Sequence, residues 1–599
     1  MHPKSIRTAA LVILVAGTAL NMYGFSLEPF KEGPVALFLR SLIISIKMFI
    51  YDLNLLEVPL AQEQPLFLEL YILVFYAAVL TSISAIIMLF GRRVITLLSL
   101  LFRRRKFDHV FIGVNNRSVL VAQGIENEEV AFIEFPDEKE GGKISVSSVL
   151  KGLSGEGEKS GGSVCKGALI LFAKRRIRFG AADRVFAAIG LEKLKRLVDE
   201  HTAFYILSDD HDRNLDELMA LLEDTDLHRN TIHVCLSREG VSRYYKASLK
   251  HTGVHFIYPS SLSVVELMTT PSCHPASVMT PSKTGPAGTV EKGLNALVVG
   301  FGETGQAVTK FLYEFSAAVL PDGTPAPASI VVSDSRIERL KGQVCFDNPG
   351  LGETGIISYE NYGTESSEFW NSLESRINDL NYISISLKDE SASLDLACTI
   401  FMYAIKKRRG GVHGLRIIVR KRYTLSHERK LVDKMNEKAG EEVIICYGEY
   451  AKVFTAEKIV SKSRSGINRN ATSLADRIGK AYTEVSGEKV SVVPDSDSFH
   501  SKNRARMELH QMISRANHAA SISILTGGAT EPGEESLLML AKMEHLRYSR
   551  YLTAHGYSYG EEDDDVFNTN HQICSWEELR EEDRKYHLDM VKAQLKVIE

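Results

Sequence analysis

The sequence predicts an α/β protein with N-terminal transmembrane helices, two tandem Rossmann-type domains and a small, mostly helical C-terminal domain. Two apolar stretches long enough to cross a bilayer lie near the start of the chain. Two later regions alternate short apolar runs with helical patterns, which is typical of parallel βαβ units. A chain of 599 residues also exceeds one hydrophobic core, since such cores stop growing at about 250 to 300 residues.

Composition excludes several classes of protein. The chain is 44% hydrophobic and 24% charged, with a formal net charge of -4, so we expect no nucleic-acid partner. Its seven cysteines are scattered singly, without a CxxC pair. We therefore expect no disulfide framework and no metal site, and we place most of the chain in a reducing compartment.

The membrane module is predicted over residues 1–106, with helices at about 8–25 and 66–90. Basic residues flank both stretches: Lys4 and Arg7 precede the first, and Arg92, Arg93 and the run 103–106 follow the second. Because basic flanks stay on the cytoplasmic side, we expect a multi-pass protein of the inner cell membrane with a large cytoplasmic C-terminal part. A cleaved signal peptide is the alternative interpretation of residues 8–25.

Between these stretches, residues 35–51 form an amphipathic helical pattern that carries Arg40 and Lys47 on its polar face. In the first interpretation, the helix lies at the membrane surface and its two cations meet lipid headgroups. In the second, several subunits gather the segment around an axis, where rings of Arg40 and Lys47 would favour anions. Whether the segment spans the membrane stays open.

The second Rossmann-type domain, predicted over residues 294–462, has the sharper motif. Strand 294–299 runs into Gly300, Phe301, Gly302, Glu303, Thr304 and Gly305, and a helix follows. In such a motif Gly300 makes the tight turn, Gly302 admits a pyrophosphate, and Gly305 allows close helix packing. Asp334 ends the next strand as the candidate ribose-binding acid. We expect NAD(H) or another adenine nucleotide here.

The first Rossmann-type domain, predicted over residues 107–268, has a degraded motif. Gly113, Asn115 and Ser118 stand where three glycines are wanted, Asn116 lies among them, and Glu134 ends the second strand. These residues are weaker candidates for a nucleotide site. A fold kept for architecture, with an empty or altered pocket, is the alternative. The Pro-, Ser- and Thr-rich residues 269–293 are predicted to be a linker.

Two such domains behind a basic membrane exit resemble the TrkA-type domains that regulate potassium conductance. The resemblance covers residues 107–462 and matches Gly300, Gly302, Gly305 and Asp334 fully, and Gly113 and Glu134 in part. It implies nucleotide binding, homo-oligomers and action on attached membrane helices.

The C-terminal region, residues 463–599, resembles a ryanodine-receptor repeat domain over about 535–599. The resemblance rests on the segments 543–548, 556–560 and 575–579, with Tyr548 and Tyr557 in place of tryptophans. It implies ligand recognition, and the family's bacterial members occur in nucleotide signalling and defence. The candidate ligand-binding residues are Glu544, His545, Arg547, Tyr548, Tyr557 and Trp576. Alternatively, Glu544 and Arg547 form a salt bridge and the tyrosines build the core.

Two functions of different classes remain. The first is a nucleotide-sensing membrane effector or ion-channel regulator, in which ligand binding to the cytoplasmic domains controls the membrane helices, with antiviral defence as one setting. Its partners are membrane lipid and a small nucleotide. The second is a membrane-bound NAD(P)-dependent oxidoreductase. We find no catalytic residues by motif, so the first is favoured.

The topology is testable by cysteine labelling in intact cells with an impermeant maleimide. Glu57→Cys should be labelled from outside and Lys4→Cys should not, because the basic flanks hold both ends of the chain inside. The unsubstituted protein is the control, since its cysteines all follow the basic run. The reverse pattern would indicate three crossings or a cleaved signal peptide.

Overall fold

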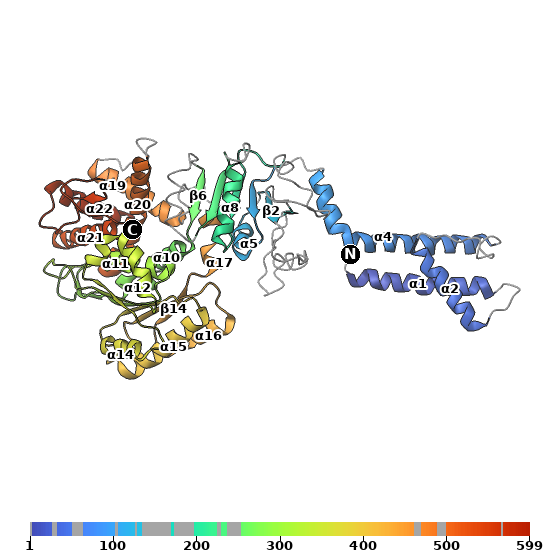
Figure 1. The fold of residues 1–599 in the computed structure, drawn as a ribbon, viewed down its shortest axis with the longest axis horizontal. Coiled ribbons are helices and arrows are strands. Elements are labelled where there is room, and N and C mark those ends of the chain that lie inside the picture. The colour runs from blue at the N-terminus through green and yellow to red at the C-terminus, as the bar shows by residue number, and fades with distance from the viewer. Residues whose placement is uncertain are drawn as a thin grey trace. The chain divides into compact units, whose positions relative to one another are not determined.

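A computed structural model gives the chain as two compact units, residues 1–106 and 107–599 (Figure 1). The residues described are 3–26, 33–50, 64–101, 106–125, 128–134, 169–172, 197–223, 229–236, 253–460, 469–487, 499–564 and 567–598. The basic run 103–105 and Glu57 lie outside them. Each unit is described by itself.

The described residues of the first unit form the helices α1 (Pro3–Ser26), α2 (Pro34–Met48) and α4 (Pro65–Leu101). Residues Thr8–Ser26 and Pro65–Ala85 are long and apolar enough to cross a membrane. The helix predicted at 66–90 continues through Arg92 and Arg93, and the one predicted at 35–51 ends three residues earlier, at Met48.

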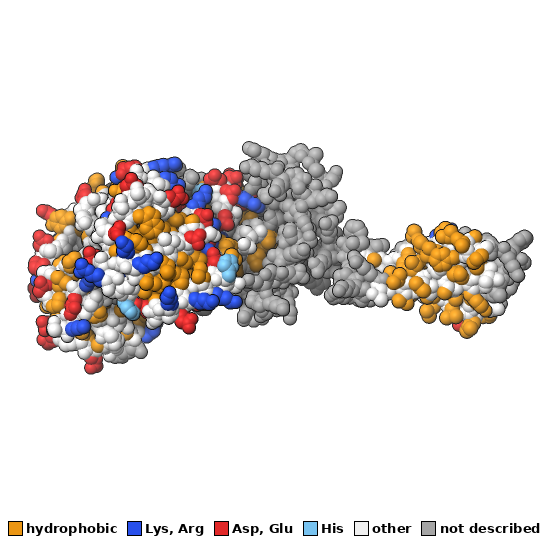
Figure 2. Space-filling model, turned by 90° about the horizontal axis from the view of Figure 1, so that it is seen from below, with side chains coloured by type: hydrophobic (Ala, Val, Ile, Leu, Met, Phe, Trp, Pro, Cys, Tyr) orange, Lys and Arg blue, Asp and Glu red, His pale blue; other side chains and the backbone are white. Residues whose placement is uncertain are grey.

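The polarity of α2 is inverted relative to a helix in a water-soluble bundle. Its buried face holds Ser41 and Ser45 beside Ile44 and Met48, and the Ser45 hydroxyl accepts a hydrogen bond from Asn21 of α1 at 3.0 Å. Its exposed face carries large apolar side chains: Val35, Phe38, Leu39, Ile43 and Ile46. Small polar residues between helices and apolar residues outside are the pattern of helices packed in lipid. Figure 2 shows the resulting hydrophobic surface of this unit.

The second unit contains two parallel six-stranded sheets of the same topology. The first has the order β3-β2-β1-β4-β5-β6. Its strands are β1 (His109–Ile112), β2 (Val130–Glu134), β3 (Leu169–Phe172), β4 (Ala203–Ile206), β5 (Thr231–Cys235) and β6 (Val254–Ile257). Helices α5 (Asn116–Gln123), α8 (His211–Leu222) and α10 (Pro259–Thr269) follow β1, β4 and β6.

The second sheet has the order β11-β10-β9-β12-β13-β14. Its strands are β9 (Asn295–Val299), β10 (Ser329–Ser333), β11 (Ile357–Glu360), β12 (Tyr382–Ile385), β13 (Arg416–Arg420) and β14 (Ile444–Tyr447). Its helices are α11 (Glu303–Phe315), α12 (Ile337–Asp347), α13 (Pro349–Glu353), α14 (Ser367–Arg376), α15 (Glu390–Lys407) and α16 (Ser426–Ala439). The short helices α17 (Tyr450–Val453) and α18 (Ala456–Ile459) follow β14 but pack into the core of the first sheet. Both sheets therefore have the Rossmann strand order, with the reversal beside β1 and β9.

The predicted linker 269–293 is instead part of the folded core. It forms the short helices η2 (Pro271–Cys273) and η3 (Pro275–Val278) and the antiparallel pair β7 (Thr280–Pro281) and β8 (Val290–Lys292). Cys273, Val278 and Val290 are buried in the core of the second sheet. Proline and serine initiate turns in this segment, and its apolar residues still pack, so composition alone misassigned it.

The C-terminal region packs on the second Rossmann fold through helix α11. Its helices are α19 (Arg469–Ser486), α20 (Phe499–Thr526), α21 (Glu534–Ala554) and α22 (Glu581–Ile598), with a small parallel pair, β15 (Ser558–Tyr559) and β16 (Thr569–Asn570). Ile522, Leu540, Met543 and Val591 share one buried cluster with Val308 and Leu312 of α11. The region is therefore mostly helical, as predicted, and continuous with the preceding core.

Candidate functional site

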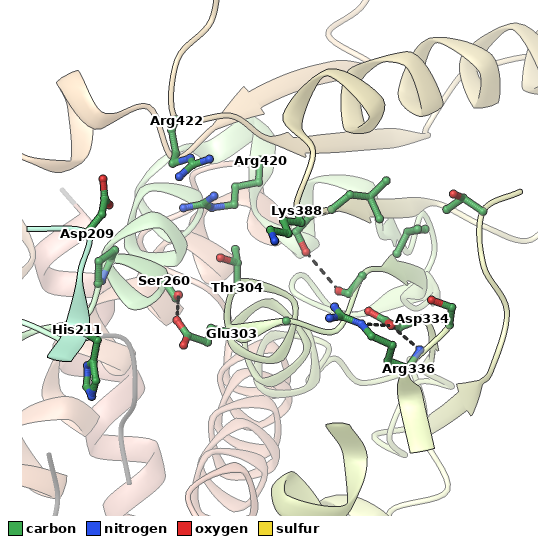
Figure 3. A pocket seen from close by; sticks show the side chains of 18 of the residues that line it. Asp209, His211, Ser260, Glu303, Thr304, Asp334, Arg336, Lys388, Arg420 and Arg422 are labelled. Carbon is green, nitrogen blue, oxygen red and sulfur yellow. Dashed lines mark hydrogen bonds and ion pairs between the residues drawn. The ribbon is translucent and has the colours of Figure 1, made fainter. Parts of the chain in front are cut away.

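The carboxyl ends of both sheets open into one cleft of 610 Å³ (Figure 3). The second sheet contributes the ends of β9, β10, β12 and β13 and the start of α11. The first sheet contributes residues that follow β4 and β5, and α10 contributes Ser260. Ligands of open α/β sheets bind outside the carboxyl ends of the strands, where the strand order reverses. The cleft occupies that position in the second sheet.

The glycine motif shapes the floor of the cleft. Gly300 has φ +90°, and a Cβ there would lie 2.6 Å from the Ser386 carbonyl oxygen. A Cβ at Gly305 would lie 1.9 Å from the Gly300 carbonyl oxygen, so α11 approaches β9 closely only with glycine. Gly302, by contrast, lines the cleft, and a Cβ there would meet nothing within 4 Å.

The N-terminus of α11 points its amides into the cleft without a side-chain cap. Gly302 is the N-cap residue, and it lacks the side-chain oxygen with which Ser, Thr, Asp or Asn would accept from the first amides. Glu303 and Thr304 of the first turn line the cleft as well. Uncapped amides together with the helix dipole form an anion-binding position.

Asp334 stands at the end of β10, as predicted. Its Oδ2 accepts a hydrogen bond from the Phe301 amide at 2.8 Å, and its Oδ1 accepts one from the Arg336 amide at 2.7 Å. Its side chain is 9% exposed. These two bonds fix the carboxylate beside the glycine turn, in the place where an acid binds a nucleotide ribose.

Basic side chains form the wall of the cleft beyond β12 and β13. Lys388 follows β12, Arg420 ends β13, and Arg422 lies two residues further. The carboxylate of Glu390 pairs with the Arg422 guanidinium and accepts from the Arg422 amide at 3.0 Å. Its Oε1 lies 3.7 Å from Arg420. One carboxylate is thus shared by two guanidinium groups. We call Lys388, Arg420 and Arg422 the basic wall.

The corresponding position of the first sheet is capped from within the chain. Gly113 makes the same turn, with φ +86°. The Asn115 Oδ1 accepts from the Ser118 amide at 3.0 Å, and the Ser118 hydroxyl accepts from the Asn115 amide at 2.9 Å. This capping box engages the Ser118 amide in the first turn of α5 and the Asn115 amide before it, and it places the two side chains over the helix N-terminus. Asn116 bonds to the Tyr423 hydroxyl at 2.9 Å. Glu134 ends β2, and its side chain lies outside the described residues.

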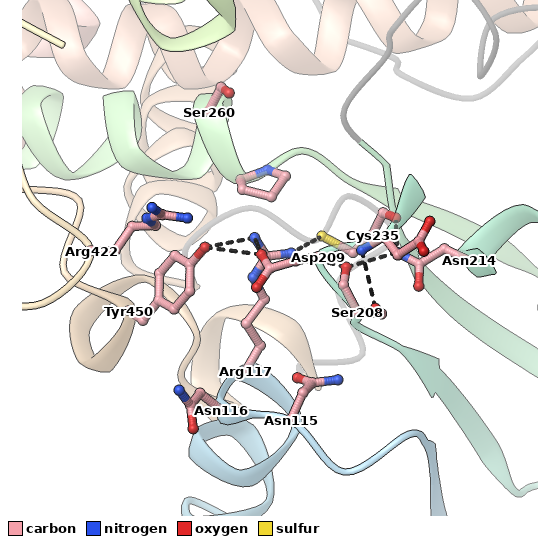
Figure 4. A network of polar contacts seen from close by, with 12 residues as sticks. Asn115, Asn116, Arg117, Ser208, Asp209, Asn214, Cys235, Ser260, Arg422 and Tyr450 are labelled. Atoms are coloured by element: carbon pink, nitrogen blue, oxygen red, sulfur yellow. Dashed lines mark hydrogen bonds and ion pairs between the residues drawn. The ribbon is translucent and has the colours of Figure 1, made fainter. Parts of the chain in front are cut away.

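Arg117, directly behind this cap, joins the two Rossmann folds (Figure 4). Its guanidinium donates to the Ser208 carbonyl at 3.1 Å and to the Tyr450 hydroxyl at 2.7 Å, and it pairs with Asp209. It also lies 3.3 Å from the Cys235 sulfur. Burial raises the pKa of the Cys235 thiol to about 11, so this thiol stays protonated at neutral pH.

The C-terminal candidates divide into two groups, of which the first is an internal ion-pair network. Arg547 is fully buried and donates to both oxygens of Glu544, at 2.8 and 2.9 Å, and to Glu314 of α11 at 2.8 Å. Burial raises the pKa of Glu314. The pKa of Glu544 lies well below its ordinary value, because Arg547 and His518 outweigh the effect of burial. Glu544 and Arg547 therefore form a salt bridge with each other, as in the alternative interpretation of the sequence.

The second group is an aromatic cluster within the same region. The His545 Nε2 donates to the Cys574 carbonyl at 2.9 Å, and its ring lies 5.9 Å from Trp576 and 5.1 Å from His587. Tyr548 lies 5.8 Å from His587. Tyr557 is buried against Tyr551 and Leu552. Burial lowers the pKa of His545. The ligand role of this cluster stays a prediction.

Several residues of the cleft were not predicted from the sequence. They are Arg117, Asp209, Ser260, Lys388, Arg420, Arg422 and Tyr450. Most of them lie just after the carboxyl ends of strands, and that position is the signal by which they could have been found. Within the described residues, no group of three or more His, Cys, Asp or Glu side chains could hold a metal ion.

Comparison with known proteins gives only distant likenesses. No family model matches the chain, and no curated protein matches it. GsuK bound to ADP aligns at 14% identity and a TM-score of 0.31, over 75% of this chain and 95% of that one. The GsuK channel aligns at 13% and 0.32, over 74% and 93%. A dipicolinate synthase component from Bacillus halodurans aligns at 12% and 0.22, over 58% and 96%.

The close approach at Gly305 predicts a specific loss of stability. Gly305→Ala should lower the thermal unfolding midpoint, because its Cβ collides with the Gly300 carbonyl and overpacking costs about 1 to 3 kcal/mol. Gly342→Ala on α12 is the matched control, since a Cβ there meets nothing within 4 Å. Equal midpoints for Gly305→Ala and the unsubstituted protein would show that the turn is not closely packed.

The buried network predicts a larger loss for Arg547→Met. This change leaves Glu314 and Glu544 buried without their cation, which costs about 3 to 5 kcal/mol. Urea unfolding followed by tryptophan fluorescence should report it, because Trp576 lies in the same region. Lys542→Met, which removes an ion pair to the exposed Glu577, should cost at most about 1 kcal/mol. An unchanged midpoint together with lost nucleotide binding would favour the ligand interpretation instead.

Proposed function

We propose that the cleft at the start of α11 binds an adenine nucleotide and that the chain is a nucleotide-sensing membrane effector. One observation supports nucleotide binding. The α11 N-terminus, which the Gly300 turn positions, has no side-chain cap and faces a 610 Å³ cleft at Gly302. Phosphate would lie at the α11 amides, and Asp334 would accept from the ribose. The basic wall adds positive charge to the same cleft.

The first Rossmann fold has a different role in this proposal. Its α5 N-terminus is capped by the Asn115 side chain, which accepts from the Ser118 amide, and Arg117 is held by Asp209 and Tyr450. A phosphate at α5 would have to displace the cap. The first fold therefore forms the opposite wall of the shared cleft, and each chain holds one nucleotide.

The membrane part of the proposal rests on the first unit. Two of its helices are long and apolar enough to cross a bilayer, and α2 turns its apolar face outward and its serines inward. Helix α4 ends at Leu101 and β1 begins at His109, so the membrane helix and the first sheet are joined by a short stretch of chain. A short connection transmits displacement better than a long flexible one.

The activity proposed is regulation of ion transport rather than catalysis. A nucleotide that contacts both folds across the cleft binds best when their separation matches its length, so binding favours one arrangement of the two folds. Helix α4 precedes β1 of the first fold in the sequence. The resemblance of the tandem units to TrkA-type domains favours potassium conductance as the regulated process and a homo-oligomer as the working form.

Gly302→Asp should abolish nucleotide binding and leave the fold intact. The new Cβ enters open space, while the carboxylate repels phosphate at the helix N-terminus. Isothermal titration of the detergent-purified full chain with ADP and NAD(H) measures the loss, and the thermal midpoint checks folding. Gly342→Asp adds the same charge at an open position on α12 and should bind normally. Binding retained by Gly302→Asp would place the nucleotide elsewhere.

A further inference from the structure

The two halves of the cleft differ in charge. A nucleotide laid across the strand-order reversal places its adenosine over β10, its first phosphates at α11 and its remaining part over β12 and β13. The adenosine half meets Asp334, a fixed carboxylate, and Arg336, whose Nε lies 3.7 Å from the Asp334 Oδ1, so these two charges offset each other. The remaining part meets the basic wall, where Glu390 is the acid paired with Arg420 and Arg422.

The basic wall has unneutralised charge. The carboxylate of Glu390 is engaged by the Arg422 guanidinium and amide, and Arg420 lies 3.7 Å from it. The Arg420 Nε is buried and has no hydrogen-bond partner within the described chain. Lys388 is exposed at the end of β12. The wall thus carries three cations against one carboxylate.

The other acids of the cleft belong to other walls. Asp209 pairs with Arg117 and accepts from the Tyr450 hydroxyl at 3.2 Å. Glu303 turns toward Ser260 of α10, 3.5 Å away. Glu365 follows β11, the strand next to β10, and so lies on the adenosine side of the cleft. The basic wall therefore faces the remaining part of the ligand with net positive charge.

We propose that the cleft takes a nucleoside triphosphate in preference to NAD⁺, with its terminal phosphate against Arg420 and Lys388. This inference rests on the proposed function and names its ligand class. The oxidised nicotinamide ring is a cation, and over β12 and β13 it would meet three more cations. A terminal phosphate in the same place gains charge-assisted hydrogen bonds, which guanidinium groups form in bidentate geometry.

The test is isothermal titration of the full chain with ATP, ADP and NAD⁺, without divalent cations. ATP should bind more tightly than ADP, and ADP more tightly than NAD⁺. Arg420→Gln should weaken ATP binding about tenfold to a hundredfold and should not weaken NAD⁺ binding, because it removes a cation that would face the nicotinamide ring. Lys388→Met, at an exposed position that tolerates substitution, should weaken ATP binding up to about fivefold. Lys407→Met removes an exposed cation that pairs with Glu374 on α14, and it should leave the affinities for both ATP and NAD⁺ unchanged.

The outcomes separate the two proposals. If NAD⁺ binds as tightly as ATP, or if Arg420→Gln and Lys388→Met weaken both ligands equally, the triphosphate assignment is wrong while the nucleotide site stands. If neither ATP, ADP nor NAD⁺ binds the unsubstituted protein, the proposed function fails and the inference fails with it.

Discussion

The contact between the Gly305 Cα and the Gly300 carbonyl oxygen is the constraint on which the site depends. Because there is no side chain at residue 305, α11 starts directly against β9. Because α11 begins so close to β9, its N-terminus lies at the point where the strand order reverses, between β9 and β12. Asp334 then fixes the turn by accepting from the Phe301 amide. An anion position, a ribose position and a basic wall consequently share one cleft.

The two Rossmann folds show how side chains decide function on a common backbone. Both sheets have the same strand order, and both first turns use a glycine of positive φ, Gly113 and Gly300. At the third motif position, however, Ser118 stands in the first fold and Gly305 in the second. Ser118 completes a cap with Asn115, whereas α11 has glycine as its N-cap. One helix end is closed by its own sequence, and the other is open.

Much of the fold could be predicted because parallel strands buried on both faces appear as consecutive apolar residues. The runs at 203–208, 231–236, 382–386 and 443–447 correspond to β4, β5, β12 and β14. The short strand β11, with the sequence ISYE, has no such contrast with its neighbours. The segment 269–293 looked like a linker because its prolines and glycines mask Cys273 and Val290, which tertiary packing buries.

The site was predictable only where the chemistry is local. Gly300, Gly302, Gly305 and Asp334 belong to one strand, turn and strand, so spacing finds them. Arg420, Arg117 and Tyr450 come from distant elements that only the folded sheet order brings together. For Glu544 and Arg547, the sequence shows an i,i+3 pair but not Glu314, 233 residues away, which completes their network.

We propose that the second Rossmann fold holds a nucleotide and that the first does not. Native mass spectrometry of the detergent-released protein, titrated with ATP, counts bound nucleotides per chain directly. We expect saturation at one nucleotide per chain. Saturation at two would show that the Asn115 and Ser118 cap opens to a ligand, and no binding at any concentration would show that the α11 cleft is not a nucleotide site.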